Sequence, residues 1–166
     1  MWFDRMSQRA GQAVFIARIS AGEIGSSVID TEDLLIGILY MNPTLIPRSG
    51  GQLTAQELLA SFDQWRTVSP KLNTSQDIPV SDGLGRLFER SISLADEMGS
   101  DNVQLAHLLL SMMMDPECHA AIALRKAGSA PEAIRHIAIE PDAAEAQTAD
   151  FPWHHGLQDL FPNSEM

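Results

Sequence analysis

The stretch "VIDTEDLLIGIL" (Val28–Leu39) decides the fold, because a second version of it, "NVQLAHLLLSMM" (Asn102–Met113), begins 74 residues later. Both stretches place a short polar loop before a dense run of Leu, Ile and Met. The first version carries three acids, Asp30, Glu32 and Asp33, where the second has Gln, Ala and His. The pattern predicts an internal repeat in which only one copy keeps its acids.

The repeat extends to both sides of these stretches when residues 7–39 are laid over residues 81–113. The identities include Ser7/Ser81, Ala21/Ala95, Glu23/Glu97, Gly25/Gly99, Leu34/Leu108 and Leu35/Leu109. Apolar residues before each glycine recur three or four apart, as in an amphipathic helix. We expect each glycine to be a left-handed residue just past the end of its helix. The following helix is apolar on nearly all sides and should be buried. Two unrelated helix pairs remain the alternative.

More helices follow in each half. A Thr or Ser followed three residues later by Glu predicts a capping box at Thr54–Glu57 and at Ser129–Glu132. The segment 68–83 is rich in Pro, Ser, Asn and Asp and is typical of a connector. Because no window alternates with period two, we predict an all-α fold of about eight helices in two pseudo-symmetric four-helix repeats.

The expected organisation is one helical domain over residues 1–140, followed by an acidic C-terminal tail over residues 141–166. Repeat one covers about residues 3–67 and repeat two about residues 78–138. The tail has five acids after Pro141 and no Lys or Arg, and it ends in an aromatic segment, "FPWHHGLQDLF". We expect that segment to pack against its own domain or a neighbouring chain.

Composition excludes several functions. The net charge is −11, which repels phosphate and makes nucleic acid or an anionic membrane an unsuitable partner. One cysteine, Cys118, cannot form an intrachain disulfide and fits a reducing cytosol, so we expect a cytoplasmic protein. The N-terminus does not read as a signal peptide, and the longest apolar run, "LLIGILYM", is too short to span a bilayer.

The first copy reads "FDRMSQRAGQAVFIARISAGEIGSSVIDTEDLLIGIL" (Phe3–Leu39). Together with the repeat spacing, this sequence resembles the N-terminal domain of the Clp-family ATP-dependent unfoldases. In that family each copy begins near "F-(T/S)-x-R-A" and reaches "G-T-E-H-(I/L)-L-L-G-L". The resemblance covers residues 3 to about 138 and is most specific at Thr31, Glu32, Leu34, Leu35 and Gly37. It implies a Clp repeat domain with the two-fold helical fold expected above.

The resemblance also implies a function. No "GK" dipeptide occurs, so a Walker A lysine is missing and we expect a stand-alone form without the ATPase modules, without cofactor or enzymatic activity. The implied role is binding of a protein segment, degron or adaptor in a Clp chaperone–protease system. The alternative is an accessory structural subunit that docks on the protease core. The oligomeric state stays open.

In some family members the motif Glu binds the guanidinium group of a phosphoarginine tag. Only Glu32 and Thr31 carry over to this sequence, and Ala106 stands where copy two would need the Glu. Asp30 and Asp33 add negative charge, which predicts a preference for plain Arg or Lys over phosphoarginine. A structural interpretation is also open, with Thr31 as the helix N-cap and Glu32 and Asp33 as first-turn acids that favour the helix dipole.

Other candidate residues lie near the N-terminus. Trp2 and Phe3 are either core plugs or, with Arg9, the border of a surface where the resemblance places adaptors. Neighbouring residues on a helix point about 100° apart, so Cys118 and His119 do not suggest a catalytic dyad. A metal site at the His154–His155 pair is not expected, because only Asp150 lies near it.

Overall fold

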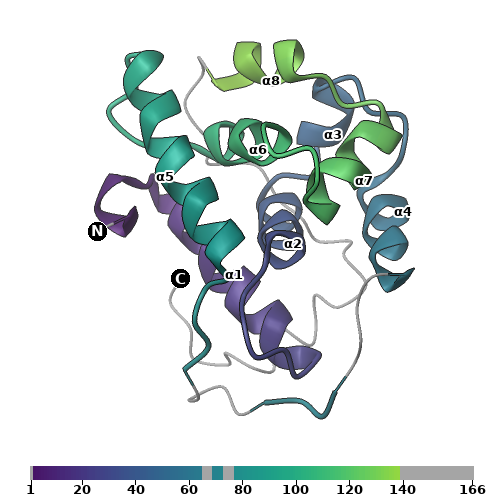
Figure 1. Cartoon of the computed structure of the whole chain (residues 1–166). Coiled ribbons are helices and arrows are strands. Elements are labelled where there is room, and N and C mark those ends of the chain that lie inside the picture. Colours follow the sequence, from purple (N-terminus) through teal and green to yellow (C-terminus); the bar gives the residue numbers. More distant parts are fainter. Residues whose placement is uncertain (1, 65–68, 73–76, 139–166) are drawn as a thin grey trace.

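The computed structural model describes residues 2–64, 69–72 and 77–138, and in these residues the chain is helical (Figure 1). Within these ranges, eight α-helices are preceded by a single-turn 3₁₀ helix at Trp2–Arg5, and a second 3₁₀ turn covers Ser61–Gln64. The α-helices are α1 (Gln8–Glu23), α2 (Thr31–Met41), α3 (Leu45–Arg48), α4 (Ala55–Ala60), α5 (Asp82–Glu97), α6 (Leu105–Met113), α7 (His119–Ala127) and α8 (Pro131–Ala138). The predicted all-α fold is confirmed. No described helix is both long and apolar enough to cross a membrane.

The two halves repeat each other in detail. Helices α1 and α5 are each capped by a serine, Ser7 and Ser81, whose hydroxyl accepts from the N–H three residues later at 3.1 Å in both cases. Gly25 and Gly99 follow these helices in the left-handed conformation, with φ of 69° and 71°. The predicted repeat, including its helix-ending glycines, is therefore confirmed.

The halves exchange short extended segments. Met6, just before α1, forms a parallel bridge with Val103, just before α6, while Ile29, before α2, bridges Val80, before α5. Four main-chain hydrogen bonds hold the two bridges. Their donors and acceptors are Ser7 N–H and Val103 C=O (2.9 Å), Val103 N–H and Arg5 C=O (2.7 Å), Ser81 N–H and Ile29 C=O (2.9 Å), and Ile29 N–H and Pro79 C=O (2.8 Å). The segments just before α1 and α2 are thus hydrogen-bonded to the segments just before α6 and α5 of the other half.

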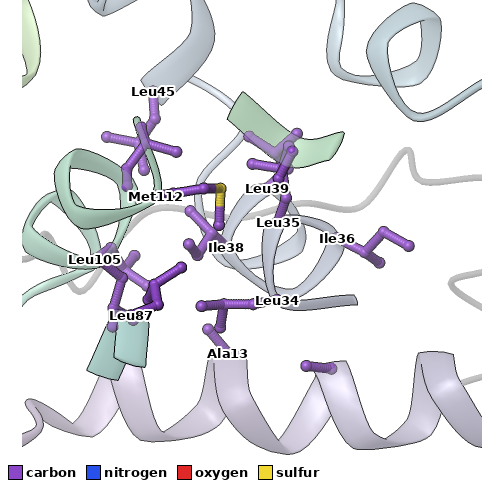
Figure 2. Close-up of a cluster of buried hydrophobic side chains, with 14 of the residues drawn as sticks. Ala13, Leu34, Leu35, Ile36, Ile38, Leu39, Leu45, Leu87, Leu105 and Met112 are labelled. Carbon is purple, nitrogen blue, oxygen red and sulfur yellow. The ribbon is translucent and has the colours of Figure 1, made fainter. Parts of the chain in front are cut away.

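Helices α2 and α6 lie in the middle of the molecule, as their apolar sequences predict (Figure 1). Every residue from Thr31 to Leu39 and from Leu105 to Met113 is buried. In the close-up, Leu34, Leu35, Ile38 and Leu39 project from α2 towards side chains of the other helices (Figure 2). Those side chains include Ala13 of α1, Leu45 of α3, Leu87 of α5, and Leu105 and Met112 of α6. Both repeats therefore share one core.

Helices α1 and α2 approach each other very closely at Gly37. A Cβ atom at Gly37 would lie 2.0 Å from the carbonyl oxygen of Ala13, far inside van der Waals contact. The inward side of α1 is built from small residues that permit this approach, namely Ala10, Ala13, Ala17 and Ala21. The "LLIG" glycine is thus required by helix packing rather than by backbone conformation.

The second half closes its central helix with an uncharged cap. Gln104 is the N-cap of α6, and the Nδ1 atom of the fully buried His107 accepts the Gln104 N–H at 2.9 Å. Since Nδ1 is the acceptor, the imidazole is neutral and carries its proton on Nε2. Burial lowers the pKa of His107 below its ordinary value.

The two expected capping boxes have different outcomes. At the start of α4, Glu57 N–H donates to the Thr54 hydroxyl (3.0 Å) and Thr54 N–H to the Glu57 carboxylate (2.8 Å), which confirms the first. The second prediction is wrong, because α8 begins at Pro131 and Ala130, not Ser129, directly precedes it. Instead, the buried Ser129 hydroxyl accepts from the Ser49 hydroxyl at 2.9 Å and ties the loop before α8 to the end of α3. Proline suits the first helical position without a side-chain cap.

Parts of the expected organisation lie outside the described residues. These parts are the end of repeat one at residues 65–67, some of the connector, and the acidic tail from residue 141. The described end of the connector does not read as a simple linker. Ile78 is buried, and Pro79 and Val80 take part in the exchanged bridge to Ile29.

We predict that Gly37→Ala lowers the free energy of unfolding by about 2–3 kcal/mol, because the new methyl group must push α1 away from α2. The matched control is Gly11→Ala in α1, where an added Cβ has nothing within 4 Å. That change should be neutral or stabilising by up to about 1 kcal/mol. Urea denaturation measures both, and equal effects would contradict the close approach.

We also predict a loss of stability in mild acid through His107. Its folded-state pKa is lowered, so its contribution is fully present above the unfolded value of about 6.5 and is lost as pH falls below it, by up to about 1.4 kcal/mol per pH unit. His107→Gln keeps a capping acceptor without a titrating group. Denaturation from pH 8 to pH 5 should show a steeper decline for the wild type. Parallel curves would show that His107 does not contribute.

Candidate functional site

The candidate acids lie at the start of α2. The sequence-based interpretation placed the N-cap at Thr31, but the N-cap is Asp30. Asp30 has extended backbone (φ −116°, ψ 179°), and its carboxylate accepts the Thr31 N–H (2.8 Å) and the N–H of Asp33. The same carboxylate accepts the hydroxyl of Ser81, the cap of α5, at 3.0 Å. Asp30 therefore stabilises the start of α2 and links it to the second half.

Asp33 is also engaged in holding the fold. It is 2% exposed, and one of its carboxylate oxygens accepts the Asp30 N–H at 3.0 Å to complete a capping box. The other oxygen accepts the Ser20 hydroxyl of α1 at 2.8 Å. Both oxygens are thus directed into the protein, between α1 and α2.

Glu32 differs from its two neighbours, because its carboxylate faces the start of α7. One oxygen accepts the hydroxyl of Thr31 at 3.2 Å, and the other lies 3.6 Å from Nδ1 of His119. The Glu32 side chain is 10% exposed, whereas that of His119 is 39% exposed. We call Thr31, Glu32, Cys118 and His119 the α2–α7 cluster. In this cluster a mostly buried carboxylate meets a partly exposed imidazole.

His119 is the residue that sequence reasoning missed here. It stands 87 positions after Glu32 and was considered only as a partner for its neighbour Cys118. The contact arises because α7 of copy two packs against α2 of copy one. That packing becomes visible only when the two halves are assembled.

Cys118 has a structural position within the cluster. It is the N-cap of α7, with Sγ accepting the Ala121 N–H at 3.4 Å. Burial raises the pKa of the Cys118 thiol, and the negative charges of Asp115 and Glu32 raise it further, against the opposing hydrogen bonds of Ala121 and Thr31. A thiol that stays protonated is a poor nucleophile. Among the described residues, no group of three or more His, Cys, Asp or Glu side chains is arranged to hold a metal ion.

The equivalent place in copy two is apolar. Leu105 and Ala106 stand where copy one has Thr31 and Glu32, and both are almost fully buried. The positions that match Cys118 and His119 in the repeat are Thr44 and the buried Leu45. At this position of the repeat, copy one therefore has a carboxylate and copy two has none.

The N-terminal candidates lie elsewhere on the molecule. Trp2 is partly buried and packs against Phe88 of α5 with ring centroids 5.1 Å apart. Phe3 is 48% exposed at the edge of the same ring, 6.3 Å away. The guanidinium of Arg9 donates to the Met41 carbonyl (3.1 Å) at the C-terminal end of α2.

These residues and the acids do not form one site. Glu32 and Met41 are nine residues apart on α2, which corresponds to about 13 Å along a helix axis. The acids lie at the α7 end of α2 and Arg9 at the opposite end. The aromatic pair packs on α5. The structure thus separates the predicted residues into an acidic cluster and an N-terminal surface.

The N-terminal domains of ClpD and Hsp104 are among the solved structures that superpose on this chain. The N-terminal domain of ClpD from Arabidopsis thaliana superposes with a TM-score of 0.64 at 21% identity, covering 82% of this chain and 96% of that one. The N-terminal domain of Hsp104 from Candida albicans gives 0.62 at 18% identity, covering 81% and 89%. At this identity the likeness shows the fold.

Curated relatives include the chloroplastic chaperone ClpC from Pisum sativum, 23% identical over 89% of this chain and 16% of its own length. The chloroplastic ClpA homolog of the ATP-dependent Clp protease ATP-binding subunit from Brassica napus is 22% identical over 80% of this chain and 15% of its own length. This chain therefore spans about one sixth of these relatives. The family of the Clp repeat (R) N-terminal domain matches residues 5–127, three quarters of the sequence, and the chain belongs to this family.

Proposed function

We propose that this chain is a non-enzymatic protein-binding module of a Clp chaperone–protease system, and that Glu32 receives a cationic side chain of the substrate or adaptor. Family membership supports the class of function, since the relatives are named as chaperones and as ATP-binding subunits of the Clp protease. Their match to this chain is confined to about one sixth of their length. The observation that carries the site is the position of Glu32 between Thr31 and His119.

Glu32 suits this role because the fold can do without its charge. Capping of α2 is performed by Asp30 and Asp33, whose oxygens accept main-chain N–H groups. The Glu32 carboxylate, by contrast, faces a neighbouring hydroxyl and an imidazole. A guanidinium group can form two parallel hydrogen bonds with such a carboxylate, and the low exposure strengthens charge-assisted bonds.

A plain arginine or lysine fits this cluster better than a phosphorylated arginine. Free N–H groups at a helix N-terminus hold phosphate in many proteins. Here the N–H groups of Thr31 and Asp33 already donate to the Asp30 carboxylate. That carboxylate also repels an incoming phosphate.

The N-terminal surface of Trp2, Phe3 and Arg9 offers a second area for contact with an adaptor. Trp2 and Arg9 are anchored, by Phe88 and by the Met41 carbonyl, while Phe3 leaves about half of its surface exposed. A rigid aromatic ring on a folded surface is a common anchor in protein interfaces. In this proposal the N-terminal surface acts separately from the α2–α7 cluster.

A stability comparison tests the division of roles among the acids. Asp33→Ala should lower the free energy of unfolding by about 2 kcal/mol, because two buried hydrogen bonds are lost. Glu32→Gln should change it by less than about 0.5 kcal/mol, since Gln keeps the shape and one acceptor. Urea denaturation at pH 7.5 measures both changes. A large loss in Glu32→Gln would make Glu32 a structural residue.

Calorimetric titration tests the binding role. Peptides with a central Arg should bind the wild type more tightly than the same peptides with phosphoarginine. Glu32→Gln should weaken binding of the Arg peptide by about 10- to 100-fold, the effect of losing a charge-assisted pair. Glu97→Gln, an exposed acid on α5, is the control and should bind as the wild type does. Unchanged binding in Glu32→Gln removes Glu32 from the site. Direct binding of the chain to a purified proteolytic ring, without peptide binding, would favour the accessory-subunit alternative.

A further inference from the structure

His119 stands beside the Glu32 oxygen that Thr31 does not engage. In the α2–α7 cluster, Oε1 of Glu32 accepts the Thr31 hydroxyl at 3.2 Å, while Oε2 lies 3.6 Å from Nδ1 of His119. A separation of 3.6 Å is longer than an ordinary hydrogen bond. A neutral imidazole therefore leaves Oε2 available to another group, whereas an imidazolium is attracted to it by charge.

The exposure of the two side chains makes this attraction matter. The Glu32 side chain is 10% exposed, and a mostly buried carboxylate gains from a counter-charge because it is poorly hydrated. The His119 side chain is 39% exposed, so its imidazole can exchange protons with solvent. An imidazolium and the cationic group of a ligand supply the same counter-charge to the same oxygen. We expect the two to compete.

The repeat changes both members of this pair together. The position that matches Glu32 holds Ala106, and the position that matches His119 holds Leu45. Both of these residues are apolar and at most 2% exposed. The fold therefore does not require a carboxylate or an imidazole at these two positions of the repeat, and the chain has either both polar partners or neither.

The charges around α7 show what holds an imidazolium at its start. Helix α7 packs against α2, α4, α6 and the second 3₁₀ turn. Apart from the inward-facing Asp33 and the buried, neutral His107, the charged residues of these elements and of the loop before α7 are acids, namely Glu32, Glu57, Asp63, Asp115 and Glu117. On α7 itself, the cations begin at Arg125, about 9 Å further along the axis. The helix dipole disfavours a cation at the start of α7, so the acids supply the attraction.

We propose that His119 regulates the α2–α7 cluster by competing with the cationic ligand for Glu32, an inference that rests on the proposed function. When protonated, the imidazole pairs with Oε2 and the carboxylate is not available to the ligand. When neutral, it leaves the carboxylate to an Arg or Lys side chain. Binding exchanges one positive charge for another, because the ligand's cation enters and one imidazolium proton passes to solvent. Histidine side chains change charge between pH 5 and 8, so mild acid opposes binding.

Calorimetric titration of the full-length chain at pH 5.5 and pH 8.0 tests this proposal. The probe is an acetylated and amidated pentapeptide with a central Arg and no other charged residue, so the peptide does not titrate in this range. The wild type should bind about tenfold more weakly at pH 5.5, as expected when one proton competes over about one pH unit. At pH 5.5 it should also release about one proton per peptide, measured in buffers with different ionisation enthalpies.

Substitutions of His119 separate competition from a structural role. His119→Gln carries no charge and should bind the peptide equally tightly at both pH values, without proton release. His119→Lys carries a fixed charge and should bind as weakly at pH 8.0 as the wild type does at pH 5.5. His136→Gln, which removes an exposed histidine of α8, is the matched control and should keep the wild-type pH profile. Circular dichroism at both pH values checks that each variant is folded.

The outcomes distinguish this regulation from the proposed function itself. Equal affinity of the wild type at the two pH values would overturn the regulation, and so would an unchanged pH profile in His119→Gln. In either case the proposed function stands if Glu32→Gln still weakens binding at pH 8.0. A peptide that does not bind the wild type at pH 8.0 would overturn the proposed function and the regulation with it.

Discussion

The fold depends on two reciprocal main-chain bridges between its halves. Met6 pairs with Val103 and Ile29 with Val80, and each pair lies immediately before a helix of its own half. Because the bridging hydrogen bonds cross from one repeat to the other, the start of α2 is fixed partly by the chain before α5. The Ser81 hydroxyl, which donates to the Asp30 carboxylate, adds a side-chain link at the same place. The position of the acidic turn is therefore a property of the whole domain.

Within four residues, the acidic turn holds two acids that cap α2 and one, Glu32, that does not. Asp30 and Asp33 perform the same capping that Gln104 and His107 perform in copy two without formal charge. The repeat thus shows that capping a central helix does not need acids. Glu32 has no such task, and Ala106 at its matching position is buried in the core. Keeping a mostly buried carboxylate costs desolvation energy, and the proposed cationic ligand would compensate for that cost.

The sequence predicted the fold better than the site. The repeat, the helix-ending glycines and the burial of α2 and α6 follow from local patterns, since periodicity and Gly conformation act over a few residues. The N-cap of α2 was placed one residue too late, because Asp30 and Thr31 are both good caps and only the backbone decides between them. The contact of Glu32 with His119 joins residues 87 positions apart and depends on how α7 packs against α2. Ser129 was misassigned for a related reason, since its partner Ser49 lies in the other half.

Native-state hydrogen exchange at the Ile29 and Val103 amides tests most directly whether the two repeats form one unit. Each of these amides donates across the interface between the halves. If the reciprocal bridges couple the repeats, both amides exchange only through global unfolding, with the same free energy as urea denaturation gives. A markedly lower free energy at either amide would mean that a bridge opens while the rest of the domain stays folded. That result would contradict the account of a single platform built from two interlocked repeats.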